Sequence, residues 1–214
     1  MFLNSLSNPT KKALEKLDSS VFFSQTHAYL AGGTALALHL GHRYSEDLDF
    51  FTRKKFIAQD ILQLITEIGR FQTNRVGWQT ILGKFEDVKL SLFYYKYPLL
   101  AKEKIVYKNA KLASLEDIAA MKIAAIADRG TKRDFIDLLF LTKSFSLKEM
   151  LKFYNRKYKN LASRQTYILK SLFYFVDAEK DPMPEMIERI NWREIKTFFE
   201  KEVKKIAKST FYKQ

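Results

Sequence analysis

Apolar residues in the first half of the chain recur with two different periods, which predicts short strands interleaved with helices. Residues 28–31 and 48–51 are compact apolar runs bounded by turn-forming residues, as expected of buried strands. Between them, residues 34–40 fit a short helix closed by Gly41. Residues 58–68 place Ile and Leu on one face at helical spacing, which predicts an amphipathic helix.

Strand-like and helix-like segments also flank this region. Asn8-Pro9 is expected to cap a first helix that runs to about Leu17, since Pro is tolerated in a first helical turn. Three further strands are predicted by alternating apolar residues, with Glu86-Asp87 as the hairpin turn between the last two; they cover residues 71–76, 79–85 and 88–94.

The second half of the chain is predicted to be helical. Ser114 and Asp117 form a variant of the capping box, and the helix that they open is expected to run to Asp128, with Gly130 as its stop. Further helices are expected near residues 133–142, 146–158, 161–176 and 191–206. Strands followed by a run of helices predict an α+β protein with a mixed sheet flanked by helices and then a helical C-terminal domain. We expect the sheet domain to cover residues 1–110 and the helical domain residues 111–214.

Composition narrows the class of protein. Of the 214 residues 47% are hydrophobic, and there are only 7 Gly and 4 Pro, so a sizeable core is expected. Because Cys is absent, disulfides and thiolate metal sites are excluded. No apolar run approaches the roughly 18 residues that span a bilayer, and the N-terminus does not resemble a secretory signal. We therefore expect a cytoplasmic protein with no membrane partner.

The net charge of +13 is concentrated towards the end of the chain, where residues 143–214 carry 17 Lys and Arg against 9 Asp and Glu. Residues 150–176 contain six basic side chains, four Tyr and no acid. Cations with interleaved aromatics are what an RNA-binding surface needs. The alternative is a solvated Lys-rich helical surface with Tyr and Phe in the core, and this stretch alone favours the alternative slightly.

Two carboxylates and a glycine turn are the strongest candidates for chemistry. Asp47 and Asp49 lie two apart on a predicted strand, so they share a face with Cα atoms roughly 6.6 Å apart and can reach one metal ion. Mg²⁺ takes one or two carboxylates and completes its shell with water and phosphate. The turn at residues 32–34 opens a helix and can present N–H groups to a phosphate. An acid pair without an ion is disfavoured because the two charges repel each other.

A resemblance follows from these residues together. Gly32-Gly33-Thr34 followed by Ser45-Glu46-Asp47-Leu48-Asp49-Phe50 resembles the first motif of the AbiEii/AbiGii-type nucleotidyltransferase toxins, a branch of the polymerase-β-like nucleotidyltransferases. The segment 121–138 is similar to the later helical motif of that family, and the order and spacing of the motifs agree.

The resemblance implies a nucleotidyltransferase-type sheet and a specific set of roles. Asp47 and Asp49 would hold Mg²⁺ and a nucleoside triphosphate, while Thr34 and the Gly33 backbone would touch its phosphates. Lys122 and Asp134 would complete the nucleotide pocket. The acceptor would be tRNA or another RNA, and the charge of the basic C-terminal helices makes them the candidate surface for it. The family also implies a toxin with a cognate antitoxin as its partner.

The helical motif has structural interpretations as well. Lys122 and Arg129 are seven residues apart and share a helix face, so Lys122 could reach a triphosphate or simply extend to solvent. Asp134 could stabilise a helix terminus, or pair with Lys122 or Arg129 to shape the pocket.

One position departs from the superfamily, which usually offers a third carboxylate on a later strand. In the segment 88–93, Lys89 and Ser91 share a face, and Ser91 stands at the expected acid position. A serine hydroxyl is a poor base and a weak metal ligand, and Asp87 lies roughly 13 Å away along a strand. We count Lys89 and Ser91 as nucleotide-binding candidates only.

Three functions follow. The first is an active Mg²⁺-dependent nucleotidyltransferase. The second is a catalytically weakened nucleotide-binding protein that acts by binding RNA or a partner. The third is a metal-dependent glycosyltransferase, against which the Gly-Gly-Thr element and the helical end of the chain argue.

Overall fold

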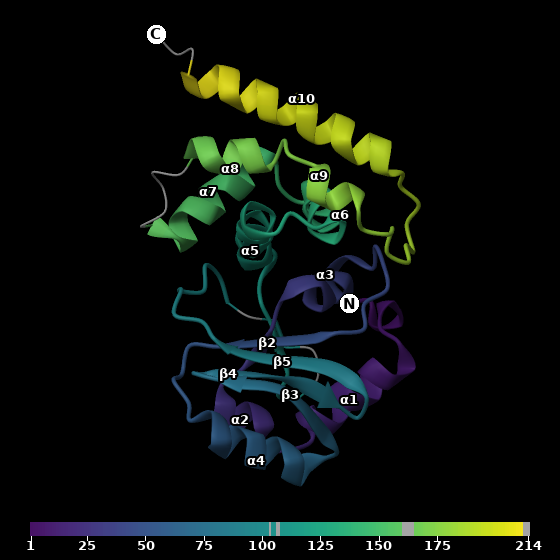
Figure 1. Cartoon of the computed structure of the whole chain (residues 1–214), viewed down its shortest axis with the longest axis vertical. Helices are drawn as coiled ribbons and strands as arrows, with labels where there is room; N and C mark the ends of the chain where they lie inside the picture. Colours follow the sequence, from purple (N-terminus) through teal and green to yellow (C-terminus); the bar gives the residue numbers. More distant parts are fainter. Residues whose placement is uncertain (103, 106–107, 160–164, 212–214) are drawn as a thin grey trace. The chain divides into compact units, whose positions relative to one another are not determined.

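The computed structural model describes residues 1–102, 104–105, 108–159 and 165–211. The chain divides into two compact units, Met1–Ser114 and Leu115–Gln214, which are coloured purple to teal and teal to yellow in Figure 1. No described helix is both long enough and apolar enough to cross a membrane.

The first unit is built on a seven-stranded mixed sheet with the strand order β3-β4-β5-β2-β1-β7-β6. Two neighbouring pairs, β2 with β5 and β1 with β7, are parallel, and the other pairs are antiparallel. The mixed sheet predicted from the sequence is confirmed. The strands are β1 (Tyr29–Leu30), β2 (Leu48–Thr52), β3 (Phe71–Gly77), β4 (Thr80–Phe85), β5 (Val88–Tyr94), β6 (Lys104–Ile105) and β7 (Lys111–Leu112).

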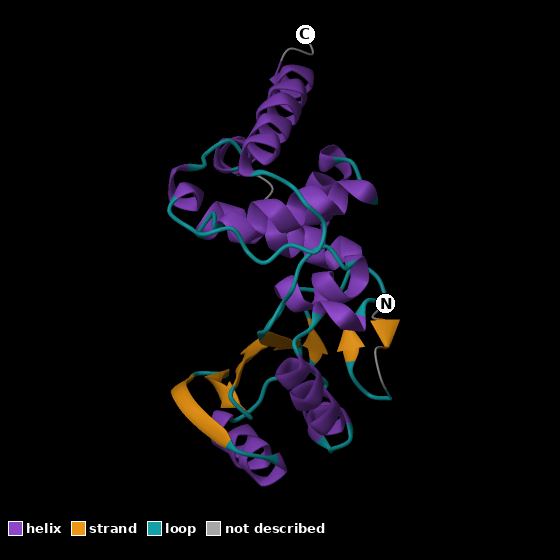
Figure 2. Cartoon of the chain, turned by 90° about the vertical axis from the view of Figure 1, so that its right-hand side faces the viewer, coloured by secondary structure: helices purple, strands orange, loops and turns teal. Residues whose placement is uncertain are grey.

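Helices cover the two sides of this sheet unequally. Figures 1 and 2 show α1, α2 and α4 together on one side of the strands and α3 on the other. The helices are α1 (Asn8–Asp18), α2 (Phe22–Thr26), α3 (Gly32–Leu40) and α4 (Ala58–Ile68), preceded by a 3-10 turn at Leu3–Ser5.

Alternation along the strands places the core on one face of the sheet. Leu48 and Phe50 of β2 are fully buried, as are Leu90 and Leu92 of β5, and Phe50 packs against Phe22 with ring centroids 5.3 Å apart. The intervening positions of β2 are only half-buried. Because successive side chains point to opposite faces, the residues between these apolar positions form a second, more open face.

Local sequence signals explain several elements. Glu86 and Asp87 both have positive φ, 48° and 66°, as the two central residues of the hairpin turn between β4 and β5 require. Gly41 closes α3 with φ 66°, and α4 spans the residues expected from its apolar face. The first helix is capped by Ser7, whose hydroxyl accepts the N–H of Thr10; the expectation that Asn8-Pro9 would cap it was wrong.

The second unit is helical. Its elements are α5 (Leu115–Asp128), α6 (Lys132–Phe140), a 3-10 turn at Leu141–Lys143, α7 (Leu147–Lys157), α8 (Gln165–Ser171), α9 (Val176–Glu179) and α10 (Trp192–Phe211). The fully buried ring of Phe135 lies between Phe175 and Phe199, with centroid distances of 5.2 and 5.3 Å. A buried ion pair joins α7 to α5, with Lys157 Nζ 2.6 Å from Asp117 Oδ1.

The expected helix over residues 161–176 was wrong, because α8 ends at Ser171 and a separate short helix begins at Val176. Residues 161–164 lie outside the described part of the chain. The break lies beside Phe175, which is half-buried and packs on Phe135 and Trp192, so contacts with distant residues favour the break over a continuous helix. The short elements α2, β6 and β7 were not predicted, since two to five residues carry too little periodicity.

The basic stretch of residues 150–176 was expected to form either an RNA-binding surface or a solvated helical surface with Tyr and Phe in the core, and its described tyrosines divide between the two. Tyr154 and Tyr158 are at most 4% exposed, and Lys157 is buried in its ion pair, as the structural alternative expected. Tyr167 and Tyr174 are about half exposed, at 52% and 53%.

Candidate active site

In the first unit, two acids flank the start of β2. Asp47 directly precedes the strand and Asp49 is its second residue, while the alternating residues Leu48 and Phe50 are fully buried. Both acids are half-buried, and 35% of the Asp47 side chain is exposed. The open face of the sheet therefore carries carboxylates that an ion from solution can reach.

The neighbouring strand β5 supplies the other candidates from this unit. The parallel register sets Asp49 beside Ser91, which is 3% exposed. Lys89 extends its amino group to 3.7 Å from Asp47 Oδ2, and 63% of its side chain is exposed. An ion pair this exposed is worth little to stability, so Lys89 can exchange Asp47 for another anion at small cost.

Gly32 brings the first turn of α3 against Asp49. A Cβ atom at Gly32 would lie 3.3 Å from Asp49 Oδ2, and φ is 66°, so a side chain would be both crowded and strained. No side chain caps α3 at Ala31, whose own N–H donates to the Asp49 carbonyl at 3.0 Å. A helix N-terminus without a side-chain cap beside Asp49 suits an anion such as a phosphate, and Gly33 lies in its first turn.

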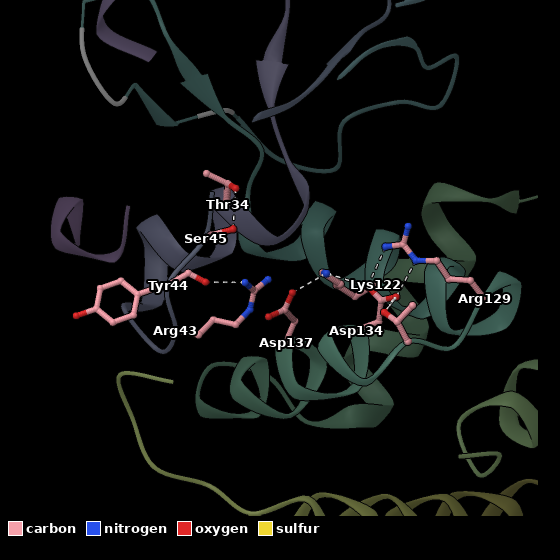
Figure 3. A network of polar contacts seen from close by, with 9 residues as sticks. Thr34, Arg43, Tyr44, Ser45, Lys122, Arg129, Asp134 and Asp137 are labelled. Carbon is pink, nitrogen blue, oxygen red and sulfur yellow. Dashed lines mark hydrogen bonds and ion pairs between the residues drawn. The ribbon is translucent and has the colours of Figure 1, made fainter. Parts of the chain in front are cut away.

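Two buried hydroxyls, those of Thr34 and Ser45, hold the main chain at Asp47, and Figure 3 shows the contact between the two. Thr34 Oγ1 donates to the Asp47 carbonyl and lies 2.8 Å from Ser45 Oγ. Because Thr34 has one hydroxyl proton, Ser45 must be the donor between the two hydroxyls. Thr34 and Ser45 are 1% and 8% exposed, so this chain of hydrogen bonds is shielded from water. It fixes the backbone that carries Asp47.

The acid pair fits a magnesium ion shared with a phosphate ligand. Among the described residues there is no group of three or more His, Cys, Asp or Glu that could hold a metal by itself. Two accessible carboxylates beside a helix N-terminus match the way Mg²⁺ is bound with phosphate oxygens and water. The Ser91 hydroxyl next to Asp49 adds only a weak ligand.

In the second unit, Lys122 is enclosed by carboxylates. Its amino group lies 2.9 Å from Asp134 Oδ1 and 2.6 Å from Asp137 Oδ2. The Lys122 side chain is 7% exposed, and the two acids are at most 1% exposed. Figure 3 shows the three side chains converging, with Lys122 from α5 and both acids from α6. The ion pairs therefore fasten α5 to α6.

Asp134 is the most strongly bound acid of this group. It accepts from Arg129 at 2.9 and 3.2 Å and from the Thr131 hydroxyl at 2.6 Å, in addition to Lys122. Burial raises the pKa of the Asp134 carboxyl, but the nearby charge of Lys122 and the hydrogen bond and charge of Arg129 outweigh it and hold the pKa well below its usual range. Asp134 is therefore ionised at neutral pH and orients Arg129, whose side chain is 60% exposed.

The structure thus gathers the predicted residues into two groups. The first unit brings together Gly33, Thr34, Asp47, Asp49, Lys89 and Ser91, and the second brings together Lys122 and Asp134. Sequence reasoning missed two contributors, Ser45 and Thr131, which carried no signal of their own. Asp137 lies one helical turn after Asp134, a position that favours a structural role, and it pairs with Lys122.

A family model and a related sequence both match most of the chain. The model of the family described as nucleotidyl transferase AbiEii toxin, type IV toxin–antitoxin system, matches residues 15–105 and 96–212. An uncharacterized protein of Aquifex aeolicus (strain VF5) is 39% identical over 207 residues, covering 94% of this chain and 98% of that protein.

Two solved structures share the fold at low sequence identity. The antibiotic-resistance factor ANT(2'')-Ia has a TM-score of 0.55 and 13% identity, over 73% of this chain and 95% of the other. The nucleotidyltransferase toxin MenT4 of Mycobacterium tuberculosis H37Rv has a TM-score of 0.52 and 14% identity, over 92% and 84%. The nucleotidyltransferase-type fold expected from the sequence is confirmed.

Proposed function

The chain belongs to the AbiEii nucleotidyltransferase toxin family, and from this premise we propose that it is a Mg²⁺-dependent enzyme that transfers a nucleotidyl group to RNA. The expected donor is a nucleoside triphosphate, and the expected acceptor is a tRNA end. The observation that carries the proposal is the half-exposed pair Asp47 and Asp49 beside the N-terminus of α3. We also propose that the protein acts in the cytoplasm, opposed by a cognate antitoxin.

In the proposed reaction an acceptor hydroxyl oxygen attacks the α-phosphorus of the triphosphate. The new O–P bond forms as the bond to pyrophosphate breaks, and the hydroxyl proton is released. Asp47 and Asp49 would hold Mg²⁺, which neutralises charge on the phosphates. The Gly33 N–H and the Lys89 ammonium would bind phosphate oxygens, and Thr34 would keep Asp47 in place through its carbonyl.

The helical unit carries the other two proposed site residues, Lys122 and Asp134. Lys122 is neutralised by two carboxylates, so its proposed contribution is to fix α5 against α6. Asp134 would act through Arg129, because it holds that guanidinium in a defined position while most of the side chain remains exposed. A guanidinium held in this way suits phosphate oxygens.

Ser91 is the observation that favours the alternative function, a nucleotide-binding protein with weakened catalysis. Ser91 lies beside Asp49 in the strand register. A third carboxylate at this position would polarise the acceptor hydroxyl, whereas a serine hydroxyl is a poor base. Phosphoryl-transfer catalysis depends mainly on positioning and charge neutralisation, so losing one base lowers the rate without abolishing it. We therefore keep the active enzyme as the first proposal.

A labelling experiment separates the two functions. Pure protein is incubated with Mg²⁺, total tRNA and each α-³²P-labelled nucleoside triphosphate in turn, and the RNA is resolved on a gel. We expect labelled RNA, and we expect Asp49→Asn to lose the label while the matched control Asp87→Asn, in the exposed hairpin turn, retains it. Nucleotide binding without label in any acceptor would contradict the enzyme and support the alternative.

A further inference from the structure

The sheet face that carries Asp49 continues across β5 and β4 to the edge strand β3. Pairing registers place its residues in rows that cross the strands: Lys84 is opposite Lys89, Leu82 is opposite Ser91, and Thr80 is opposite Phe93. Along β2 the same rows contain Asp49 beside Ser91 and Phe51 beside Phe93. We call this surface the open sheet face, defined by Asp49, Phe51, Arg75, Leu82, Lys84, Lys89, Ser91 and Phe93.

Cations populate the part of this face that lies away from β2. Lys84, Lys89 and Arg75 are all exposed, and Arg75 is opposite Leu82 in the register. Among the described residues, no carboxylate pairs with Lys84 or Arg75. The acids of the nearby hairpin turn are engaged elsewhere, Glu86 with Lys16 and Asp87 with Arg70. With strands roughly 4.8 Å apart, the cations begin one strand away from Asp49 and extend about 14 Å to the sheet edge.

Two aromatic residues, Phe51 and Phe93, lie next to Asp49 and Ser91 on this face, two residues further along β2 and β5. Phe51 and Phe93 are half-buried neighbours with ring centroids 5.4 Å apart and an angle of 31° between the rings. The buried ring of Tyr29 stacks on Phe51 at 6.2 Å, and Tyr95 meets Phe51 edge-on at 5.3 Å. These contacts hold the two phenylalanine rings in place while part of each stays exposed, roughly 6.6 Å along the strands from Asp49 and Ser91.

We propose that the open sheet face binds the unpaired end of a polynucleotide acceptor. Its phosphates lie on Lys84 and Arg75, and its terminal base stacks on Phe93 and Phe51. A terminal hydroxyl is thereby brought to Asp49. This inference rests on the proposed function, because the acceptor site has meaning only if a nucleotidyl group is transferred there.

The chemistry of the face selects this ligand over others. Cations that meet phosphates, combined with rings that stack on bases, are the two components of single-strand binding. A paired base has both faces stacked inside the duplex, so only an unpaired end can use the rings. A positively charged small acceptor would be repelled by three nearby cations. The interleaved charges also differ from the apolar centre of a protein interface.

The salt dependence of RNA binding tests the cationic part. A fluorescein-labelled single-stranded oligoribonucleotide is titrated with protein at several salt concentrations, and binding is followed by fluorescence anisotropy. Lys84→Ala and Arg75→Ala are each expected to weaken binding roughly tenfold. Each variant should also reduce the slope of log affinity against log salt by about 0.7, because one phosphate contact is lost. The matched control Lys12→Ala changes an exposed lysine of α1, on the other side of the sheet, and should change neither quantity.

The aromatic part has a different signature. Phe93→Ala should weaken binding roughly tenfold without changing the salt slope, and Phe93→Tyr, which keeps the ring, should restore the affinity. The same RNA annealed into a blunt duplex should compete poorly. The proposal is overturned if Lys84→Ala and Arg75→Ala behave like Lys12→Ala, or if the duplex competes as well as the single strand. Binding requires no turnover, so an inactive wild-type protein with these signatures would contradict the proposed enzyme and the acceptor role, and it would leave the open sheet face as an RNA-binding surface of the alternative, catalytically weakened protein.

Discussion

Asp47 and Asp49 in the sheet unit are half-exposed, whereas Asp134 and Asp137 in the helical unit are at most 1% exposed and share the ammonium of Lys122. Both groups combine two aspartates with a lysine, but the lysine of the first group, Lys89, is 63% exposed and 3.7 Å from Asp47. Charges that are buried need partners within the protein, while charges at the surface keep their capacity to bind an ion from solution. The sheet group therefore has the properties of a binding site, and the helical group has those of an internal fastening.

This difference shows that residues of a motif can have either a ligand-binding role or a structural role. Lys122 and Asp134 lie in the segment that resembles the later family motif, and Asp47 and Asp49 lie in the segment that resembles the first, so the resemblance alone assigns both groups to one site. Burial and contacts do distinguish them, because a carboxylate that already accepts from Lys122, Arg129 and Thr131 has little capacity left for a ligand. Substitutions in the two groups should therefore fail in different ways.

The largest difference is expected from removing each lysine by the same substitution. Lys122→Met leaves two buried carboxylates without their shared cation and should lower the free energy of unfolding by about 3–5 kcal/mol. Lys89→Met removes an exposed cation and should change that free energy by less than about 0.5 kcal/mol. Urea denaturation of the two variants measures both values.

A third variant identifies the cause of the loss. If uncompensated charge is responsible, Lys122→Met combined with Asp134→Asn and Asp137→Asn should be more stable than Lys122→Met alone. Equal losses in Lys122→Met and Lys89→Met would remove the distinction between the two groups.

Acid should affect the helical group next most strongly. The pKa of Asp134 is lower in the folded protein than its ordinary value of 3.8, because Lys122 and Arg129 outweigh the effect of burial. Its contribution is therefore fully present above about pH 4 and is lost as the pH falls below that value. Asp134→Asn should be less stable at pH 7 by on the order of 2 kcal/mol and should lose less stability than the wild type on acidification. Thermal unfolding between pH 7 and pH 2 measures this, and parallel pH profiles would contradict it.

Prediction from sequence succeeded where the signal was local. Helix α4 follows from its apolar face, and the Glu86-Asp87 turn follows from its position between two alternating segments. It failed where distant segments decide, as at Phe175, whose ring packs on Phe135 and Trp192 at the break in the expected helix.

The candidate site shows the same limit. Nothing local indicates that Ser45 reaches Thr34 across eleven residues, or that Gly32 lies against the Asp49 side chain. These contacts arise because α3 packs back on β2, which only the folded chain makes visible. The predicted roles of the site residues remain predictions until they are tested.

Two threonines allow a smaller and more selective comparison. Thr34 supports the backbone of Asp47, and Thr131 donates directly to Asp134. Thr34→Val should weaken Mn²⁺ binding, measured by electron paramagnetic resonance without nucleotide, by roughly fivefold, equivalent to about 1 kcal/mol for one lost hydrogen bond. Thr34→Ser should restore it, and Thr131→Val should lower only stability. Unchanged Mn²⁺ affinity with a raised KM for nucleotide would instead assign the Thr34 hydroxyl to the phosphates.

An effect of similar size is expected at Ser91, but the sign of the change in stability should depend on whether metal is present. Ser91→Asp would add a third, poorly exposed carboxylate beside Asp49, so without metal the repulsion should lower the free energy of unfolding by about 1 kcal/mol. Saturating Mg²⁺ should reverse this, because an ion that binds only the folded state stabilises it in proportion to its affinity. The matched variant Ser91→Asn adds similar bulk without charge and should not respond to Mg²⁺.

Transfer activity in the same variant decides whether the missing acid matters. If Ser91 limits deprotonation of the acceptor hydroxyl, Ser91→Asp should raise kcat by roughly threefold to tenfold, and Ser91→Asn should not, because general-base catalysis needs a carboxylate. A gain in metal-dependent stability without a gain in kcat would show that the sheet group binds its ion well enough already. The rate would then be set by the positioning of the substrates. Asp47 and Asp49 would differ from Asp134 and Asp137 in binding a metal ion from solution rather than a lysine of the protein.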